Sequence, residues 1–202
     1  MFTMPIFTMP MFLVLVAAYL LGSIPFGLVF TRLAGKGDIR AIGSGNIGTT
    51  NVLRTGSKLL AALTLIFDAG KGAVAVIIAG IYGDSTLAAI AGAAAITGHC
   101  FPVWLRFQGG KGVATALAVY GAFDWRLGAL FILLWLGTAA IFRFSSLAAL
   151  VATMGCTIFA FVMGTDMAIA LAVLALTGLV WIRHHQNIGR LLSGTESKIG
   201  AK

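Results

Sequence analysis

Residues 11–30 read MFLVLVAAYLLGSIPFGLVF, a run that contains no charged side chain. About 20 predominantly apolar residues are enough for an α-helix to cross the roughly 30 Å hydrocarbon core of a bilayer. The rest of the chain has the same character, since 59% of its 202 residues are hydrophobic and only 10% are charged. This composition excludes a soluble globular domain and predicts an all-α integral membrane protein.

Further apolar runs follow the first one, and together they predict a seven-span helical bundle. They occupy residues 59–82, 86–105, 113–123, 127–142, 147–164 and 168–181. The run at 113–123 has only about eleven residues, so it needs tilting, local thinning of the bilayer or shelter by neighbouring helices. A five-span alternative therefore stays open, in which residues 113–142 form one crossing plus a re-entrant piece.

Basic residues set the predicted orientation. The polar segment 32–58 carries a single acid, Asp38, and five basic residues, which are Arg32, Lys36, Arg40, Arg54 and Lys58. Because cytoplasmic loops are enriched in Lys and Arg, this segment is expected in the cytoplasm and the N-terminus outside. With seven spans the C-terminus is cytoplasmic. The net charge of +8 then lies mostly in short loops that attract anionic lipids or substrates, and it predicts no nucleic-acid partner.

The chain is expected to form one domain. Residues 1–10 contain a short repeat, FTMP at 2–5 and again at 7–10, without the basic start of a signal peptide. They are interpreted as an N-terminal extension, and residues 11–202 as a single transmembrane domain. Cys100 and Cys156 lie in apolar surroundings without metal-binding spacing, so neither a metal site nor a redox role is predicted.

A glycine-rich cationic turn, RFQGGKGVAT at residues 106–115, separates two apolar runs. Its glycines free the backbone to bend and let a ligand approach closely. Successive N–H groups, with a helix expected to start at Val113, favour an anion, and Lys111 adds a full positive charge. A Walker loop is excluded, because Leu105 and Gly112 stand where that motif needs glycine and Ser or Thr. The alternative is a turn whose lysine only sets topology.

Two more polar clusters are predicted on the same side of the membrane. Residues 43–54 read GSGNIGTTNVLR, a flexible loop rich in hydroxyl and amide donors that ends in an arginine suited to bidentate phosphate contact. Its formal G-x-G-x-x-G is a weak match, since no strand precedes it. In the tail, His184, Asn187 and Arg190 recur every three residues and are expected to share a face of a helix that continues the last span.

Charged residues inside a span are the remaining signal. Asp68 and Lys71 lie three residues apart, so they share a helix face and are expected to be paired towards the bundle interior. A buried tether between helices and a direct substrate contact both remain open for them. For His99, a structural histidine and a functional one remain open. Arg190 and Glu196 equally fit a structural pair at a helix end.

Two Gly-rich cationic loops and a His–Asn helix face on one side predict a composite site for phosphate chemistry at the membrane surface. The rival interpretation is a transporter for a phosphorylated anion. Such a protein is expected to have polar sites near the bilayer midplane and an internal repeat. The sequence contains no such repeat beyond the FTMP tandem, and the clusters fall on one predicted face.

Five motifs together resemble the bacterial acyl-phosphate:glycerol-3-phosphate acyltransferase family. They are SGNIGTTNVLR (44–54), DAGKG (68–72), GHCFP (98–102), GGKGVAT (109–115) and HHQNIGRLLSGTE (184–196), and the resemblance covers residues 11–196. It implies transfer of a fatty acyl group from acyl-phosphate to the 1-hydroxyl of sn-glycerol 3-phosphate, which gives 1-acyl-sn-glycerol 3-phosphate and phosphate. The implied setting is phospholipid biosynthesis at the cytoplasmic face of the bacterial inner membrane, without a cofactor.

Most of the expected site residues follow from these motifs, and Ser146 is added because it lies in a predicted inner turn near the site. The catalytic candidates are His184, Asn187 and Lys111. The candidates for substrate binding are Ser44, Gly45, Asn46, Gly48, Thr50, Asn51, Arg54, Gly109, Gly110, Gly112 and Thr115. The candidates for support are Asp68, Lys71, His99, Ser146, Arg190 and Glu196. Two routes for the hydroxyl proton stay open: His184 as general base, or the phosphate of the donor itself.

Overall fold

The computed structural model describes residues 9–200, and these form helices joined by short turns without a β-strand. The helices are α1 (Met9–Gly22), α2 (Phe26–Leu33), α3 (Thr49–Val52), α4 (Lys58–Tyr82), α5 (Ser85–Cys100), α6 (Val113–Phe123), α7 (Trp125–Phe142), α8 (Ser145–Val162), α9 (Met167–Arg183) and α10 (His185–Leu192). Short 3-10 turns lie at Ile39–Ala41, Leu53–Thr55 and Val103–Leu105. Most of the expected extension, residues 1–8, lies outside the described residues.

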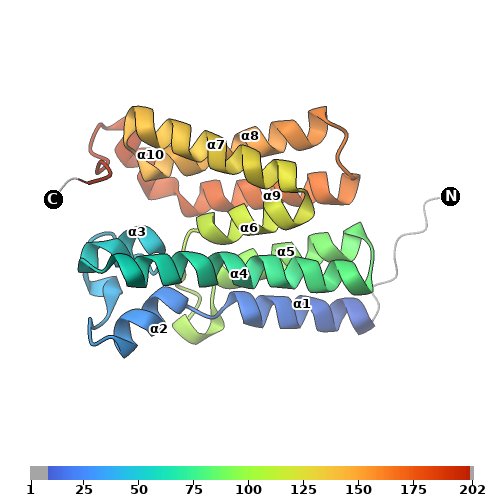
Figure 1. Cartoon of the computed structure of the whole chain (residues 1–202), viewed down its shortest axis with the longest axis horizontal. Coiled ribbons are helices and arrows are strands. Elements are labelled where there is room, and N and C mark those ends of the chain that lie inside the picture. The colour runs from blue at the N-terminus through green and yellow to red at the C-terminus, as the bar shows by residue number, and fades with distance from the viewer. Residues whose placement is uncertain (1–8, 201–202) are drawn as a thin grey trace.

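The helices form two layers with α6 between them. In Figure 1, α1 and α4 run through one layer together with α5, and α7, α8 and α9 make up the other. The ring of Tyr120 on α6 is fully buried and meets the ring of Phe131 on α7 edge-on, at 6.0 Å between centroids. The Tyr120 hydroxyl also donates to the Val173 carbonyl of α9 at 3.1 Å. The short helix therefore joins the layers.

The shortness of α6 has a local cause at each end. It begins after Gly112, whose φ of 81° favours glycine, and it stops at Asp124, whose carboxylate accepts the Arg126 N–H and caps α7. Ala116 and Val119 on this helix are completely buried. Shelter by neighbours was one of the conditions expected for so short a run, and the packing supplies it.

Five segments are long and apolar enough to cross a membrane. They are Met11–Leu33, Lys58–Tyr82, Ser85–Leu105, Trp125–Phe142 and Ser145–Val162. Helix α9 is one residue shorter than the shortest of these, and it is followed by α10 at a bend of 63°. The expectation that the last span continues straight into the tail helix is therefore wrong. The break falls at His184 and turns the tail helix across the end of the bundle.

The two charges inside α4 are paired, as their spacing predicted. Lys71 Nζ lies 2.8 Å from Asp68 Oδ1 and also donates to the Ile24 carbonyl at 2.8 Å, at the break between α1 and α2. The Thr115 hydroxyl donates to the Asp68 carbonyl at 2.9 Å and joins α6 to α4. His99 Nδ1 lies 3.7 Å from the Asp68 carboxylate. In the structure this cluster has the geometry of a tether between helices.

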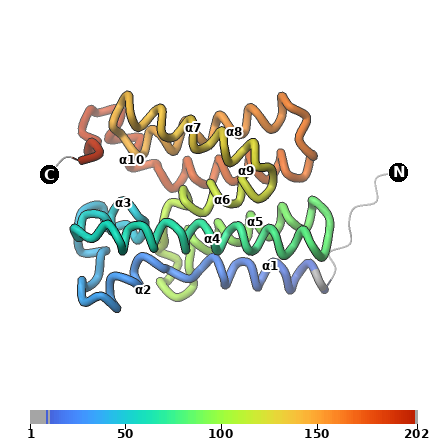
Figure 2. Tube along the Cα trace, in the orientation of Figure 1, coloured from blue at the N-terminus to red at the C-terminus, as the bar shows by residue number. Residues whose placement is uncertain are grey.

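The polar segments gather at one end of the bundle. Figure 2 shows α2, α3 and α10 at the end opposite to the start of α1. The long loop around α3 lies on one layer there, and α10 lies on the other. The site described below lies between them.

Candidate functional site

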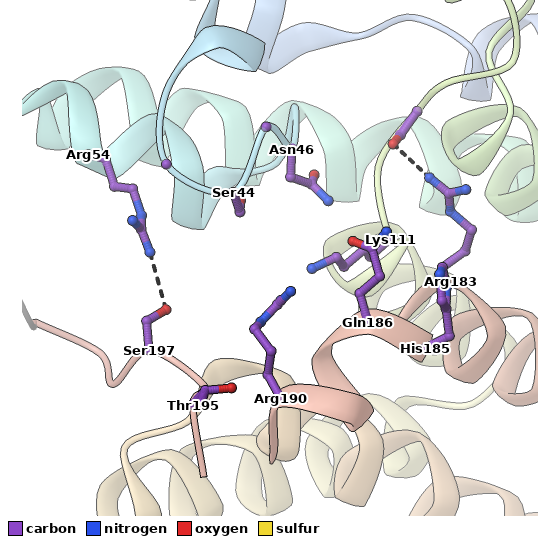
Figure 3. A pocket seen from close by; sticks show the side chains of 13 residues that line it. Ser44, Asn46, Arg54, Lys111, Arg183, His185, Gln186, Arg190, Thr195 and Ser197 are labelled. Atoms are coloured by element: carbon purple, nitrogen blue, oxygen red, sulfur yellow. Dashed lines mark hydrogen bonds between the residues drawn. The ribbon is translucent and has the colours of Figure 1, made fainter. Parts of the chain in front are cut away.

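The three polar clusters predicted from the sequence converge on one pocket of about 510 Å³. Residues of the first loop, of the glycine-rich turn and of the tail helix all line it, and Figure 3 shows their side chains directed at a common space. Four cationic side chains line the pocket, and they are Arg54, Lys111, Arg183 and Arg190. Among the described residues that line it there is no carboxylate, so the pocket is suited to anions.

The first loop presents Ser44, Asn46 and Arg54 to the pocket. Its backbone turns at Gly43 and Gly45, whose φ values of 55° and 66° favour glycine. Gly45 lines the pocket, as expected of a binding loop.

Asn51 lies behind this loop and is only 2% exposed. Its amide nitrogen donates to the carbonyls of Ile39 at 2.7 Å and Asn46 at 2.8 Å, and its oxygen accepts the Ser44 N–H at 3.1 Å. In the structure Asn51 lies outside the pocket lining and organises the loop that carries Ser44 and Asn46, and its direct contact with substrate stays a prediction.

Two further residues of the loop also stand apart from the pocket lining. Gly48 precedes α3, and its N–H donates to the Asn46 side chain at 2.9 Å. Thr50 is exposed and lies on α3 outside the residues that line the pocket. Neither residue lines the pocket in this structure, and the substrate contact expected of each stays a prediction.

The glycine-rich turn is clamped to the end of α5. The N–H groups of Gly109 and Gly110 donate to the carbonyls of Cys100 at 3.2 Å and His99 at 3.0 Å. A Cβ atom on Gly110 would collide with the His99 ring, so glycine is required there for close approach. Gly109 lines the pocket, whereas Gly110 and Gly112 are buried behind it. Thr115, completely buried against Asp68, is another expected binder that the structure places in helix packing.

Lys111 begins a chain of short hydrogen bonds. Its Nζ donates to Asn187 Oδ1 at 2.6 Å, and Asn187 Nδ2 donates to Glu196 Oε1 at 2.6 Å. Ser146 donates to the same carboxylate oxygen at 2.6 Å, and Arg190 donates to the other at 2.7 Å. Glu196 therefore collects three donors, and Asn187 holds the lysine in place.

This arrangement lowers the pKa values of Lys111 and Glu196. Burial lowers the pKa of Lys111 to about 8, helped by the charges of Arg190 and Arg183 and opposed by Glu196. Partial burial works against ionisation of Glu196, but hydrogen bonds from Ser146, Asn187 and Arg190 hold its pKa below the usual value. At neutral pH the carboxylate is ionised, and the lysine is charged but close to its titration point.

His184 stands at the break after α9 and is only 3% exposed. Its Nδ1 lies 2.7 Å from the Val180 carbonyl, which selects the tautomer with the proton on Nδ1 and leaves Nε2 as an acceptor. Burial is the main cause that lowers its pKa to about 4, with Lys111 contributing. His184 is therefore neutral at pH 7, a weak base, and it is absent from the residues that line the pocket.

The pocket is also lined by residues that were not among the expected site residues. They are Arg183, His185, Gln186, Thr195 and Ser197, besides Gly43. Arg54 reaches across to the Ser197 hydroxyl at 3.4 Å, which links the first loop to the tail. His185 and Gln186 follow the 63° bend at His184, so their side chains take directions that a straight continuation of α9 would not give them.

Comparison with known proteins shows to which family the chain belongs. Residues 12–194 match the sequence model of the family described as glycerol-3-phosphate acyltransferase. The chain belongs to this family. The relative from Dinoroseobacter shibae is 58% identical over 94% of this chain and 93% of its own length, and that from Rhodospirillum rubrum is 54% identical over 92% and 89%.

Solved structures agree with the family assignment. The crystal structure of PlsY, described as an integral membrane glycerol 3-phosphate acyltransferase in the glycerol 3-phosphate form, is 39% identical, with a TM-score of 0.91. The match covers 95% of this chain and 96% of that one. Membership makes the chain a membrane-embedded acyltransferase, and it does not favour the transporter alternative.

Proposed function

We propose that the protein transfers a fatty acyl group from acyl-phosphate to the 1-hydroxyl of sn-glycerol 3-phosphate. The products are 1-acyl-sn-glycerol 3-phosphate and inorganic phosphate, and the reaction is the first acylation of phospholipid biosynthesis. Membership of the glycerol-3-phosphate acyltransferase family supports the acceptor and the type of reaction. The observation that carries the proposal is the cationic pocket, where four positive side chains converge without an opposing carboxylate in the described lining, which suits a phosphorylated donor beside a phosphorylated acceptor.

The pocket has room for both phosphorylated groups. A volume of about 510 Å³ lies within the range of about 300–1,000 Å³ that is usual for small-molecule sites. Arg54 and Ser44 come from the first loop and Lys111 from the glycine-rich turn, with Arg190 directed between them (Figure 3). In our proposal Arg54 holds the glycerol 3-phosphate by its planar fork, and Lys111 binds the phosphate of the donor.

The chemistry needs positioning more than activation, because an acyl-phosphate is a mixed anhydride. The acceptor oxygen attacks the acyl carbonyl and forms the ester bond. The bond between that carbonyl carbon and the phosphate oxygen then breaks, and phosphate leaves with the electron pair. Lys111 stabilises the negative charge that develops on the leaving group and on the carbonyl oxygen. No covalent enzyme intermediate and no cofactor enter this scheme.

The hydroxyl proton passes to a phosphate oxygen of the donor in our scheme. His184 is neutral but weakly basic, buried and absent from the pocket lining, and these properties favour substrate assistance over a histidine base. Asn187 and Glu196 then serve to hold Lys111 in place.

The membrane arrangement completes the proposal. Seven crossings in the bacterial cytoplasmic membrane would place the start of α1 outside and the pocket at the cytoplasmic face. The gathering of polar loops at one end supports this orientation, and seven crossings require α6 and α9 to span the membrane in addition to the five long apolar segments. The fatty chain of the donor lies along the apolar bundle, and its phosphate enters the pocket.

Purified protein in detergent tests the reaction. Supplied with acyl-phosphate and glycerol 3-phosphate in the presence of EDTA, it should release phosphate and form 1-acyl-glycerol 3-phosphate, detected by mass spectrometry. Omission of the acceptor controls for hydrolysis, and Lys111→Ala controls for contaminating activity. Absence of product, or an equal rate when acyl-CoA replaces acyl-phosphate, would contradict the proposal.

A further inference from the structure

Arg183 ends α9 at the wall of the pocket, where it is half-buried. Its Nε donates to the Gly110 carbonyl at 3.1 Å, and one of its terminal nitrogens donates to the Gly109 carbonyl at 3.0 Å. The guanidinium carbon lies 5.1 Å from the centroid of the Phe101 ring. An arginine guanidinium often binds a phosphate through two parallel N–H groups. In Arg183 the edge formed by Nε and one terminal nitrogen donates instead to two successive backbone carbonyls.

This contact determines where the N–H groups of the turn point. In a planar trans peptide the carbonyl and the N–H point in opposite directions. The peptide that carries the Gly109 carbonyl is held at both ends, since its N–H, that of Gly110, donates to His99. The next peptide is held at its Gly110 carbonyl, which turns the Lys111 N–H away from Arg183. Within residues 9–200 no protein group accepts that N–H.

We propose that Arg183 is a positioning residue that holds the turn of residues 109–111 so that the Lys111 N–H and ammonium face the reacting phosphate. It acts through the turn and leaves substrate contact to Lys111. The inference rests on the proposed function of the pocket, and it adds a residue that the motifs did not point to.

Arg183 also leaves an electrostatic signature on Lys111. The charged groups around that ammonium are Glu196, Arg190 and Arg183, with neutral Asn187 in direct contact and neutral His184 nearby. The positive charge of Arg183 contributes to the lowered pKa of Lys111. Removing the charge should raise the lysine pKa, whereas exchanging arginine for lysine should leave it almost unchanged. The two effects of Arg183, geometry and charge, can thus be separated.

The experiment compares Arg183→Lys with Arg183→Gln in detergent, with Arg126→Lys as the matched control in an ion pair next to Asp124. A lysine keeps the charge but has no planar fork for two carbonyls. We expect Arg183→Lys to lower kcat by about tenfold or more, since small misplacements of reacting groups can cost that much. The KM values for both substrates should stay within about threefold of the unaltered protein, because uniform binding is kept.

Two readouts do not depend on turnover. The pKa of Lys111 can be measured by competitive acylation of its amine at a series of alkaline pH values, with mass spectrometry as the readout. The pH midpoint of labelling should be higher in Arg183→Gln and unchanged in Arg183→Lys. Hydrogen exchange in peptides spanning residues 99–112 should be faster in both variants. If the glutamine variant fails to fold, Phe101→Leu loosens the guanidinium by removing only the ring beneath it. This variant should show faster exchange and a smaller loss of kcat.

If Arg183→Gln raises KM with kcat unchanged, and Arg183→Lys has the KM of the unaltered protein, then Arg183 is a direct phosphate ligand. That result would overturn the proposal. Unaltered exchange with unaltered kinetics would also overturn it. If the unaltered protein makes no product from acyl-phosphate, the proposed function fails, and the labelling and exchange results still decide whether Arg183 holds the turn.

Discussion

Lys111 illustrates how one side chain depends on several others at the residue scale. Its ammonium is held by Asn187, Asn187 by Glu196, and Glu196 by Ser146 and Arg190. The sequence indicated all five residues as site candidates, four of them within motifs and Ser146 outside them, but it did not indicate that these form one chain of contacts. Glu196, expected to have a supporting role at most, is the common acceptor of the network.

The titration of Lys111 predicts an alkaline limit of activity. Its pKa of about 8 means that the ammonium is charged below this pH and neutral above it, so anion binding weakens as the pH rises through 8. We expect kcat/KM to fall about tenfold per pH unit above that point. Lys111→Arg keeps its charge throughout this range, so its profile should lack the limb near pH 8. The same limb in the arginine variant would assign it to another group.

His184 gives a second prediction from pH. In His184→Asn the side-chain amide replaces the Nδ1–H that donates to Val180, but no basic nitrogen remains. If the donor's phosphate takes the proton, the variant keeps a residual rate, and the acidic limb of its profile stays where it lies in the unaltered protein. The measurement is kcat/KM from about pH 3.5 to about pH 7.5, a range that includes the pKa of about 4 of His184. Loss of that limb in the variant would instead identify His184 as the base.

At the scale of elements, the short helix α6 and the bent pair α9–α10 carry the site. Helix α6 begins directly after the turn that bears Lys111, and its contact with α4 runs through the Thr115 hydroxyl. The bend at His184 brings α10 across the end of the bundle, so that Asn187 reaches Lys111. The site is thus built at helix ends, where backbone groups are free of helical hydrogen bonds.

Thr115→Val tests the role of that contact. Loss of a buried hydrogen bond to the Asp68 carbonyl should cost about 1 kcal/mol of stability, because the carbonyl already has its helical partner. The melting temperature of the detergent-solubilised protein should fall while KM for both substrates stays unchanged. Thr31→Val, whose hydroxyl bonds only within α2, is the matched control. A raised KM in Thr115→Val would restore the binding role that its motif implied.

At the scale of the whole molecule, the polar loops gather at one end of the helical bundle, and the proposed topology rests on this asymmetry. Lys36 lies at the pocket end, in the loop after α2, while Trp125 is the first residue of α7, directly after the turn from α6, and is 76% exposed. If the bundle crosses the membrane seven times with the N-terminus outside, these two positions face opposite compartments.

Single cysteines at these positions test the arrangement in cells. Lys36→Cys should resist a membrane-impermeant maleimide until the cells are opened, and Trp125→Cys should react in intact cells. Cys100 and Cys156 are buried and provide a low background. Labelling of both positions from the outside, or of Lys36→Cys alone, would contradict the orientation.

The sequence by itself determined the class of the fold, the positions of the apolar helices, the buried Asp68–Lys71 pair and the family motifs. These features are local: an apolar run long enough to span a bilayer, or two charges three residues apart, needs no knowledge of distant segments. Only the tertiary structure separated residues that line the pocket from residues that support it.

The physical reason is separation along the chain. Thr115 meets Asp68 across 47 residues, and Lys111 meets Asn187 across 76. The direction of Asn51 into its own loop, the 63° bend at His184 and the hold of Arg183 on the turn all depend on how helices pack and where their ends fall. Helical periodicity predicts which residues share a face, but packing between layers decides what that face meets.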